Sequence, residues 1–513
     1  TSQLKQNLIQ IQNSLPSTYS LPQKLIENYN SIEIQPFTND SKIDEGPYQC
    51  NDQSNVIKFR DSETTRLTVL DSDKLLLKFD NENVEKLIEV EGCYKKSQEE
   101  ENNQTNESTS QKTSRAFQNP QFHKAGNLIC DVYKIEQSLS DDKSHKVLIA
   151  KMDFRNSNLN EVKLKNSIKY FFSKCYCSSV NRQNQKLVYY NLHYNFKVKS
   201  LVEELGSDSR PKFNVQIIGI DSLSHAHALR KIPDTLEFLE SPNNNNNKNR
   251  KTFTLKNYNI LGKNTQPNLF PFLTGHNMES FPNFFINNKP GQIDNYNQTG
   301  DDLPILFYNF KKAGYTTVFY EDLPKYALFN FLTFGFKKSP ADFYARPVVL
   351  SEAYKYLSQV RESGKDLCVG SKSKIENMLE DWGSKLFSGK KANNKPPIFS
   401  FLYTSEYSHT DLNQASLLDQ PLLNYYRNML KNDDNTIFIL FSDHGFRVGG
   451  LFSDTIQGKF EHMLPLFRIS FPNKFIEEFP EAYENFKINR KGVSSPVDIY
   501  AIFVHLLDLR PDG

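Results

Sequence analysis

Residues 435–445 read NTIFILFSDHG, and this stretch decides the fold. A run of large apolar residues from Ile437 to Phe441 follows the turn-like residues KNDDN. Such a continuous β-branched and aromatic run predicts a strand buried on both faces, as in a parallel sheet. Asp443 and His444 come at its carboxyl end, where open α/β sheets build their sites. A lone Asp-His pair is more often a polar strand end, so the other strands decide whether it is a site.

From residue 212 onward, predicted strands alternate with predicted helices. FNVQIIGI is a second buried strand and ends at Asp221; ALRKIPDTLEFLE follows as a helix or a helical pair cut by Pro233. Further strands are expected in YTTVFYEDL, PIFSFLYTSEYSHTD and GKFEHMLPLFRISFP, and further helices in DQPLLNYYRNMLKN and SSPVDIYAIFVHLLDL. This alternation predicts an α/β domain over residues 208–513, with a central, mostly parallel sheet and helices on both faces.

Residues 1–207 have a different character. Alternating segments such as RLTVL, KLLLKFD, NLICDVYKIEQ and SIKYFFSKCYC predict a β-rich region, while the polar residues 99–115 predict a disordered loop. This half gathers no catalytic residue types. The predicted boundary lies near LGSDSRPK, at residues 205–212.

The charge balance excludes two classes of partner. Lys and Arg number 62 and Asp and Glu 60, so bulk electrostatics favours neither nucleic acid nor an anionic membrane surface. The segment has no apolar run of about 18 residues, the length that spans a bilayer. A signal peptide or membrane anchor is expected, if there is one, outside this segment.

The six cysteines fit neither a zinc ribbon nor a CxxC motif. Their even number and wide scatter predict structural disulfides and an extracellular or secretory, lumenal location. We expect Cys50 to pair with Cys93, whereas Cys175 and Cys177 alternate on a strand and should not pair with each other. Four sequons are compatible with a glycoprotein: Asn39, Asn103, Asn106 and Asn297.

The segment GKNTQPNLFPFLTG predicts a helix start. Thr265, two residues before Pro267, suits an N-cap, and a helix start presents N–H groups to an anion. A capping Thr with no chemistry explains this motif equally well. If the strand ends converge, however, Asp221, Asp443 and His444 form a divalent metal site, and the Thr265 oxygen completes it while acting as nucleophile. That chemistry suits displacement at phosphorus or sulfur.

The motifs IIGIDSLS, NTQPNLFPFLTG, SHTD, FSDHGFRVG, GKFEHMLPLF and SSPVDIYA resemble, in this order, those of the alkaline phosphatase superfamily. In detail they are similar to its sulfatase-like branch known as a domain of unknown function, found on secreted and membrane-anchored proteins. The resemblance implies Asp221, Asp443 and His444 as metal ligands, and Thr265 as nucleophile and fourth ligand. It also implies that Lys459, His409 and His462 contact the transferred anion or protonate the leaving group.

One departure bears on the substrate. Classical sulfatases carry Cys-x-Pro-x-Arg at the nucleophile position, whereas this chain has TQPNL from Thr265 to Leu269. A Thr there resembles phosphatases, phosphodiesterases and phosphoethanolamine or lipoteichoic-acid transferases. His409 with Glu406 or Asp411 would begin a second metal cluster, but no later His completes it. We therefore expect one divalent ion, Mn, Zn, Ca or Mg.

Two functions follow from the resemblance. The first is a metal-dependent hydrolase or transferase acting on phosphate, less so sulfate, esters of glycans or lipids outside the cytosol. The alternative is an inactive structural or binding subunit of a larger assembly, built on the same fold. Four intact metal positions favour the enzyme.

Overall fold

The computed structural model describes residues 68–71, 74–80, 84, 87, 128–138, 143–154, 161–178, 185–197, 213–241, 249–285, 299–333, 335–358, 367–370, 372–387, 396–431 and 433–509. The chain divides into two compact units. Unit 1 comprises Thr1–Tyr48, Val198–Arg346 and Lys374–Gly513, and unit 2 comprises Gln49–Lys197 and Pro347–Ser373. The predicted boundary near residues 205–212 lies outside the described residues. No sequence pattern indicated that residues 347–373 group with the first part of the chain.

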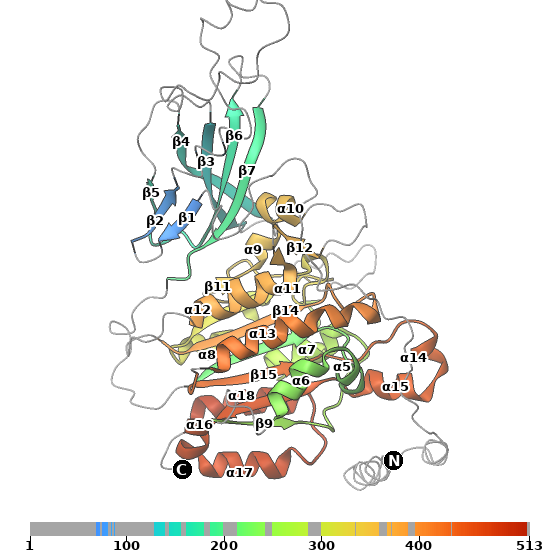
Figure 1. Cartoon of the computed structure of the whole chain (residues 1–513). Helices are drawn as coiled ribbons and strands as arrows, with labels where there is room; N and C mark the ends of the chain where they lie inside the picture. The colour runs from blue at the N-terminus through green and yellow to red at the C-terminus, as the bar shows by residue number, and fades with distance from the viewer. Residues whose placement is uncertain are drawn as a thin grey trace, which may run out of the picture. The chain divides into compact units, whose positions relative to one another are not determined.

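Unit 1 is built on a seven-stranded sheet with the strand order β11-β10-β14-β8-β15-β16-β9 (Figure 1). The five strands from β11 to β15 are parallel, and β16 and β9 continue the sheet in antiparallel pairs. The predicted α/β fold with a mostly parallel sheet is thereby confirmed. The strands are β8 (Asn214–Ile220), β9 (Arg250–Thr254), β10 (Thr316–Glu321), β11 (Phe343–Tyr344), β14 (Ile398–Thr404), β15 (Thr436–Phe441) and β16 (Phe467–Pro472).

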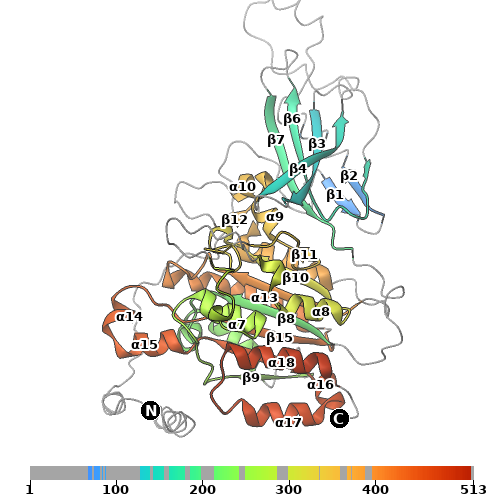
Figure 2. The same cartoon turned by 180° about the vertical axis from the view of Figure 1, so that it is seen from behind.

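Helices cover both faces of this sheet, as Figures 1 and 2 show from opposite sides. On one face, Phe272 of α7 stacks on Phe441 with ring centroids 4.6 Å apart. On the other face, the Tyr425 hydroxyl of α13 donates to Gln216 Oε1 at 2.6 Å. Among the described helices, none is long and apolar enough to cross a membrane.

The helical segments of unit 1 include the two expected on either side of Ile232. They are α5 (His225–Lys231), α6 (Pro233–Glu240), α7 (Thr265–Thr274), η3 (Met278–Ser280), η4 (Gly300–Asp302), α8 (Leu306–Lys312), η5 (Pro324–Tyr326), α11 (Lys374–Glu376), the π-helix η6 (Asn377–Ser384), α12 (Lys385–Phe387), η7 (Leu412–Leu418), α13 (Asp419–Leu430), α14 (Gly450–Asp454), α15 (Ile456–Met463), α16 (Asn473–Glu478), α17 (Pro480–Asn489) and α18 (Pro496–Asp508). Helix α9 (Arg346–Val349) crosses the division between the units.

The central strands β8, β14 and β15 are buried at every residue, which is why their sequences are continuous apolar runs. The register of β15 against β8 pairs Phe441 with Gly219. Asp443 and Asp221 each follow two residues later, so they leave neighbouring strands at the same level. The register of β14 against β8 pairs Thr404 with Ile220, so the third strand ends beside them. The parallel pairing therefore brings three polar strand ends to one edge.

Unit 2 contains antiparallel sheets, as predicted for this part of the chain. A four-stranded sheet has the order β4-β3-β6-β7, and a three-stranded sheet has the order β1-β2-β5. Both contribute to one apolar core, in which Leu77, Leu128 and Phe171 are fully buried. The elements are β1 (Thr68–Asp71), β2 (Leu76–Phe79), β3 (Leu128–Gln137), β4 (Ser144–Asp153), β5 (Glu161–Lys163), β6 (Tyr170–Ser178), β7 (Gln185–Tyr194), α10 (Glu352–Ser358), β12 (Cys368–Val369) and β13 (Lys372–Ser373).

A disulfide joins Cys130 of β3 to Cys175 of the neighbouring strand β6. The expectation of structural disulfides is thereby confirmed, and Cys175 does not pair with Cys177. Cys177 and Cys368 are also disulfide-bonded. The expected Cys50–Cys93 pair, the four sequons and the polar loop of residues 99–115 lie outside the described residues.

Candidate metal centre

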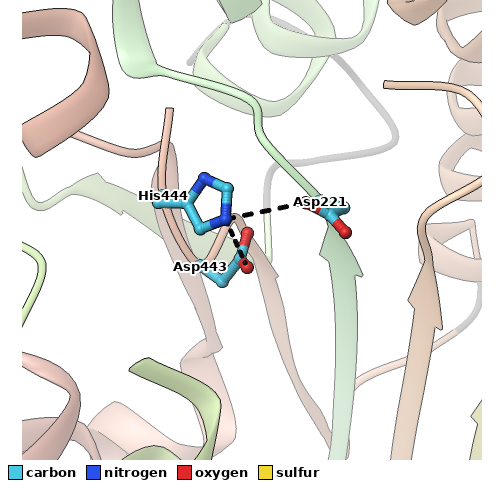
Figure 3. Close-up of side chains that lie close together, drawn as sticks. All are labelled: Asp221, Asp443 and His444. Carbon is cyan, nitrogen blue, oxygen red and sulfur yellow. Dashed lines mark ion pairs between the residues drawn. The ribbon is translucent and has the colours of Figure 1, made fainter. Parts of the chain in front are cut away.

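Asp221, Asp443 and His444 meet at the carboxyl edge of the sheet of unit 1 (Figure 3). His444 Nε2 lies 3.3 Å from Asp443 Oδ2 and 3.9 Å from Asp221 Oδ1. One potential ligand atom from each residue lies within 4.8 Å of the others, and all three side chains are buried. The convergence predicted from the strand ends is thus present for these three residues.

One hydrogen bond fixes the orientation of the His444 ring. Its Nδ1 lies 2.8 Å from the carbonyl oxygen of Gly445. Because a carbonyl only accepts, Nδ1 must carry the proton, which leaves the lone pair on Nε2. Nε2 is the nitrogen that faces the two carboxylates, and this arrangement is typical of a histidine that binds a metal.

Ser222 joins the two carboxylates. Its hydroxyl donates to Asp221 Oδ1 at 2.7 Å, and its backbone N–H donates to Asp443 Oδ1 at 3.2 Å. The other oxygen, Asp443 Oδ2, is buried and accepts no hydrogen bond from the described residues. Burial, followed by the neighbouring Asp443 carboxylate, raises the pKa of Asp221 to about 7. Two buried carboxylates with an open oxygen between them are an arrangement that a cation stabilises.

Thr265 also approaches the imidazole of His444. Its Oγ1 is 3.5 Å from His444 Nε2. The interpretation of Thr265 as N-cap is wrong by one residue, because Asn264 has the extended N-cap conformation and Thr265 is the first residue of α7. Thr265 is therefore not the residue that caps α7.

The side chain of Asn268 shapes the loop that leads into Thr265. Its Oδ1 accepts from the backbone N–H groups of Leu261 and Gly262 at 2.7 and 3.1 Å. Its amide donates to the carbonyls of Gly262 and Asn264 at 2.8 and 2.9 Å. The fully buried amide thus satisfies four backbone groups and fixes the start of α7.

The four residues fit a divalent ion. Two carboxylates, an imidazole and a hydroxyl form a hard-to-borderline donor set, which suits Zn, Mn, Mg or Ca to different degrees. Tetrahedral ligands about 2.0–2.1 Å from an ion lie roughly 3.3–3.4 Å from one another. The distances from His444 Nε2 to Asp443 Oδ2 and Thr265 Oγ1, 3.3 and 3.5 Å, agree with that spacing.

Two further histidines and an arginine lie around this centre. Burial, then the Arg447 guanidinium, lowers the pKa of His409, and His444 contributes to the same shift. His409 Nδ1 and Arg447 Nε are buried without a hydrogen-bond partner among the described residues. The His462 ring centroid lies 5.7 Å from that of His444, and His462 Nε2 hydrogen-bonds to the Lys263 carbonyl at 3.1 Å. His462 therefore supports the loop before Thr265.

Lys459 is the third residue expected near the anion. It is exposed on α15, where the sequence had been interpreted as the approach to a strand. Within the described residues, no second cluster of metal ligands accompanies the first. Glu406 is instead paired with Lys374 Nζ at 2.7 Å, and Asp411 accepts from the Asn413 N–H at the start of η7.

Sequence reasoning missed Ser222, Tyr403 and Arg447. Ser222 and Arg447 lie within motifs that the sequence analysis singled out, but their types alone carried no metal chemistry. No sequence signal distinguishes Ser222. The structure shows that its backbone has a φ of 59°. Tyr403 is one of several aromatic residues in β14, and nothing in the sequence distinguishes it from a core tyrosine.

The chain is similar to several solved structures at low identity. It shares 13% identity with the C-terminal periplasmic domain of EptC from Escherichia coli, over 62% of this chain and 88% of that one, with a TM-score of 0.39. It shares 12% with the lipoteichoic acid synthase LtaP from Listeria monocytogenes, over 61% and 76%, with a TM-score of 0.36. A protein of the alkaline phosphatase superfamily from Vibrio parahaemolyticus shares 17%, over 51% and 60%, with a TM-score of 0.34.

Because these TM-scores are all below 0.5, the assignment of the centre rests on the geometry of this chain alone. No curated protein is significantly similar to it. The family described as a protein of unknown function, DUF229, matches residues 50–512. This is the kind of family expected from the order of the motifs, and the match covers most of the sequence. The chain therefore belongs to the DUF229 family.

Proposed function

We propose that this protein is a metal-dependent hydrolase or transferase that acts on phosphate esters through Thr265. The observation that carries the proposal is the approach of the Thr265 hydroxyl to within 3.5 Å of His444 Nε2, beside two buried carboxylates. Thr265 is the first residue of α7 and not its N-cap. A threonine hydroxyl is a poor nucleophile unless a base or a metal lowers its pKa.

Asp221, Asp443, His444 and Thr265 would hold one divalent ion. When bound, such an ion supplies positive charge that lowers the pKa of the Thr265 hydroxyl and offsets the charge on the ester oxygens. Asp221 and Asp443 provide the negative charge that balances it. His444 is held by the Gly445 carbonyl with its Nε2 lone pair directed to the same point.

The residues of this chain also suit the rest of the reaction. Attack of Thr265 Oγ1 on phosphorus forms one P–O bond and breaks the ester P–O bond. Thr265 releases its hydroxyl proton to solvent, and the departing alcohol takes up one proton. His409 is our candidate for passing a proton to the departing alcohol, because its Nδ1 lies buried without a partner among the described residues. The lowered pKa of His409 favours the neutral ring, so it would take up this proton only in transit. Arg447 is our candidate ligand of the ester's anionic oxygens. Water or a second alcohol then takes the phosphoryl group from Thr265, which gives a hydrolase or a transferase.

Several finer features belong to this proposal. The substrate would be an anionic ester on a glycan or a lipid outside the cytosol, in keeping with the disulfides of unit 2. Phosphate is favoured over sulfate because position 265 is a Thr and not a Cys. Lys459 is no longer favoured as a contact of the anion, since it is exposed on α15.

The proposal is tested by turnover of two generic substrates. Purified protein, stripped of metal and resupplied with Mn²⁺, Zn²⁺, Ca²⁺ or Mg²⁺, should hydrolyse an aryl phosphodiester faster than an aryl sulfate. Asp443→Asn should reduce both metal affinity and rate, whereas Asp411→Asn is the matched control, because that carboxylate caps η7 away from the cluster. Wild-type protein that binds none of the ions and turns over neither ester would favour the inactive structural subunit.

A further inference from the structure

The ring of Tyr403 lies across a glycine in the middle of the sheet. Tyr403 of β14 pairs with Gly219 of β8. A Cβ at position 219 would lie 2.4 Å from Tyr403 Cδ2 and 2.8 Å from Phe441 Cε1. Glycine in a strand interior is destabilising by roughly 0.5–1 kcal/mol relative to alanine, and it often marks a close approach. Gly219 is therefore needed to leave room for the tyrosine ring.

The ring carries its hydroxyl to the metal centre. Tyr403 is only 2% exposed, and its hydroxyl has no well-aligned hydrogen bond to any described residue. The side chains that it faces are Asp221, Asp443 and Thr265. A buried hydroxyl without a partner costs about 1–3 kcal/mol. If this side chain served only to pack the core, phenylalanine would fill the same space without burying an unpaired hydroxyl. The hydroxyl beside three site residues therefore calls for another explanation.

The unsatisfied atoms are complementary. Asp443 Oδ2 is a buried acceptor without a hydrogen-bond partner. The Tyr403 hydroxyl is a buried donor that also has no partner, and it interacts with the same Asp443 carboxylate. A tyrosine hydroxyl carries its proton at neutral pH, so it is able to donate. A hydroxyl can donate one hydrogen bond and still accept another.

We infer that Tyr403 is a positioning residue of the metal centre: its hydroxyl donates to Asp443 and, before Thr265 loses its proton, accepts from the Thr265 hydroxyl. It thereby fixes the ligand oxygen and the attacking oxygen relative to each other, from outside the ligand set. This inference rests on the proposed function. Carboxylate ligands are commonly oriented by such outer hydrogen bonds, whose loss typically reduces metal affinity or activity 10–100-fold.

Tyr403→Phe tests the inference because it removes only the oxygen and keeps the ring over Gly219. We expect the dissociation constant for Mn²⁺ or Zn²⁺, measured by calorimetric titration of metal-free protein, to rise about 10-fold or more. With metal at saturation, kcat for the phosphodiester should fall about 10–100-fold while KM changes little. A purely structural tyrosine would lower the melting temperature without this pattern.

Tyr425→Phe is the matched control. Tyr425 is another buried tyrosine whose hydroxyl donates to a side chain, but it packs on the opposite face of the sheet, against Gln216. The Tyr425→Phe variant should be less stable than wild type but keep the wild-type metal affinity and kcat. If Tyr403→Phe binds metal and turns over ester like wild type, the inference is wrong while the proposed function stands. If wild-type protein itself neither binds metal nor reacts, the proposed function fails and this inference fails with it.

Discussion

Ser222 adopts a backbone conformation that residues other than glycine rarely use. Its φ of 59° is left-handed, and such a residue typically costs about 1 kcal/mol or more. In return, both its hydroxyl and its N–H are directed at the carboxylates Asp221 and Asp443. Local strain is therefore retained at the point where the two proposed metal ligands lie together.

Asp322 gives a prediction for pH dependence. Burial, followed by the Glu406 carboxylate, raises the pKa of Asp322 from 3.8 to about 7. The folded state therefore holds this proton more tightly than the unfolded state, so the contribution of Asp322 to stability is greatest below about pH 4. That contribution is lost as the pH rises towards 7. Asp322→Asn removes the titration and keeps an acceptor for the Ser405 N–H.

The free energy of unfolding, measured with urea at pH 4, 5.5 and 7.5, checks this prediction. The free energy of unfolding of Asp322→Asn minus that of wild type should increase by about 2–4 kcal/mol from the lowest to the highest pH. A difference that stays constant over this range, or that grows in favour of wild type, would show that Asp322 is ionised in the folded protein.

At the level of single residues, the sequence predicted the ligands but not their supports. Asp221, Asp443 and His444 were found because each follows a recognisable buried strand. The supports were not found, because the Ser222 N–H reaches Asp443 from the neighbouring strand, a contact that sequence spacing does not reveal. Nothing in the sequence distinguishes Tyr403 from a core tyrosine. Lys459 stays a prediction: it is exposed on α15, next to the buried Gly458.

At the scale of the elements, the packing of the loop after β15 against α15 requires a glycine at position 445. The Gly445 N–H donates to the His462 carbonyl at 2.9 Å. A Cβ on Gly445 would lie 2.0 Å from the Glu461 carbonyl oxygen, which is backbone and cannot rotate away. The loop that carries Asp443 and His444 is thus pressed directly against α15.

Gly445→Ala should therefore force this loop off α15. We expect a loss of about 1–3 kcal/mol in the free energy of unfolding, as in other overpacked sites, together with much weaker metal binding. Gly492→Ala is a control, because its Cβ would approach no closer than 3.4 Å to the Asn489 carbonyl oxygen. Equal behaviour of the two variants in urea melts and metal titrations would refute this account of the loop.

The elements were predicted well where periodicity and burial act together. The helical pair α5 and α6, helix α13 and helix α18 begin and end close to the expected residues. The direction of the last strands could not be predicted, because buried parallel and antiparallel strands have the same apolar composition. Strand β16 is as fully buried as β15, yet it runs antiparallel to it.

For the whole molecule, the division into two units allows a test of their independence. All the proposed ligands lie in unit 1, whereas the Cys130–Cys175 disulfide lies in unit 2 and links residues 45 apart. The chain-entropy description gives a disulfide of that span about 4 kcal/mol of stabilisation. The double variant Cys130→Ala/Cys175→Ala should therefore lower the unfolding transition of unit 2 and leave metal affinity unchanged. A folded variant that has lost its metal would contradict this division of roles.

The most direct test of the central claim follows the Thr265 hydroxyl. In metal-loaded protein, Thr265→Ala should abolish phosphodiester turnover while the free energy of unfolding changes by no more than about 0.5 kcal/mol, because this side chain caps no helix. Thr265→Ser should retain measurable turnover, since it keeps an attacking oxygen. An unchanged rate in Thr265→Ala, with the ion bound, would contradict the assignment of Thr265 as nucleophile.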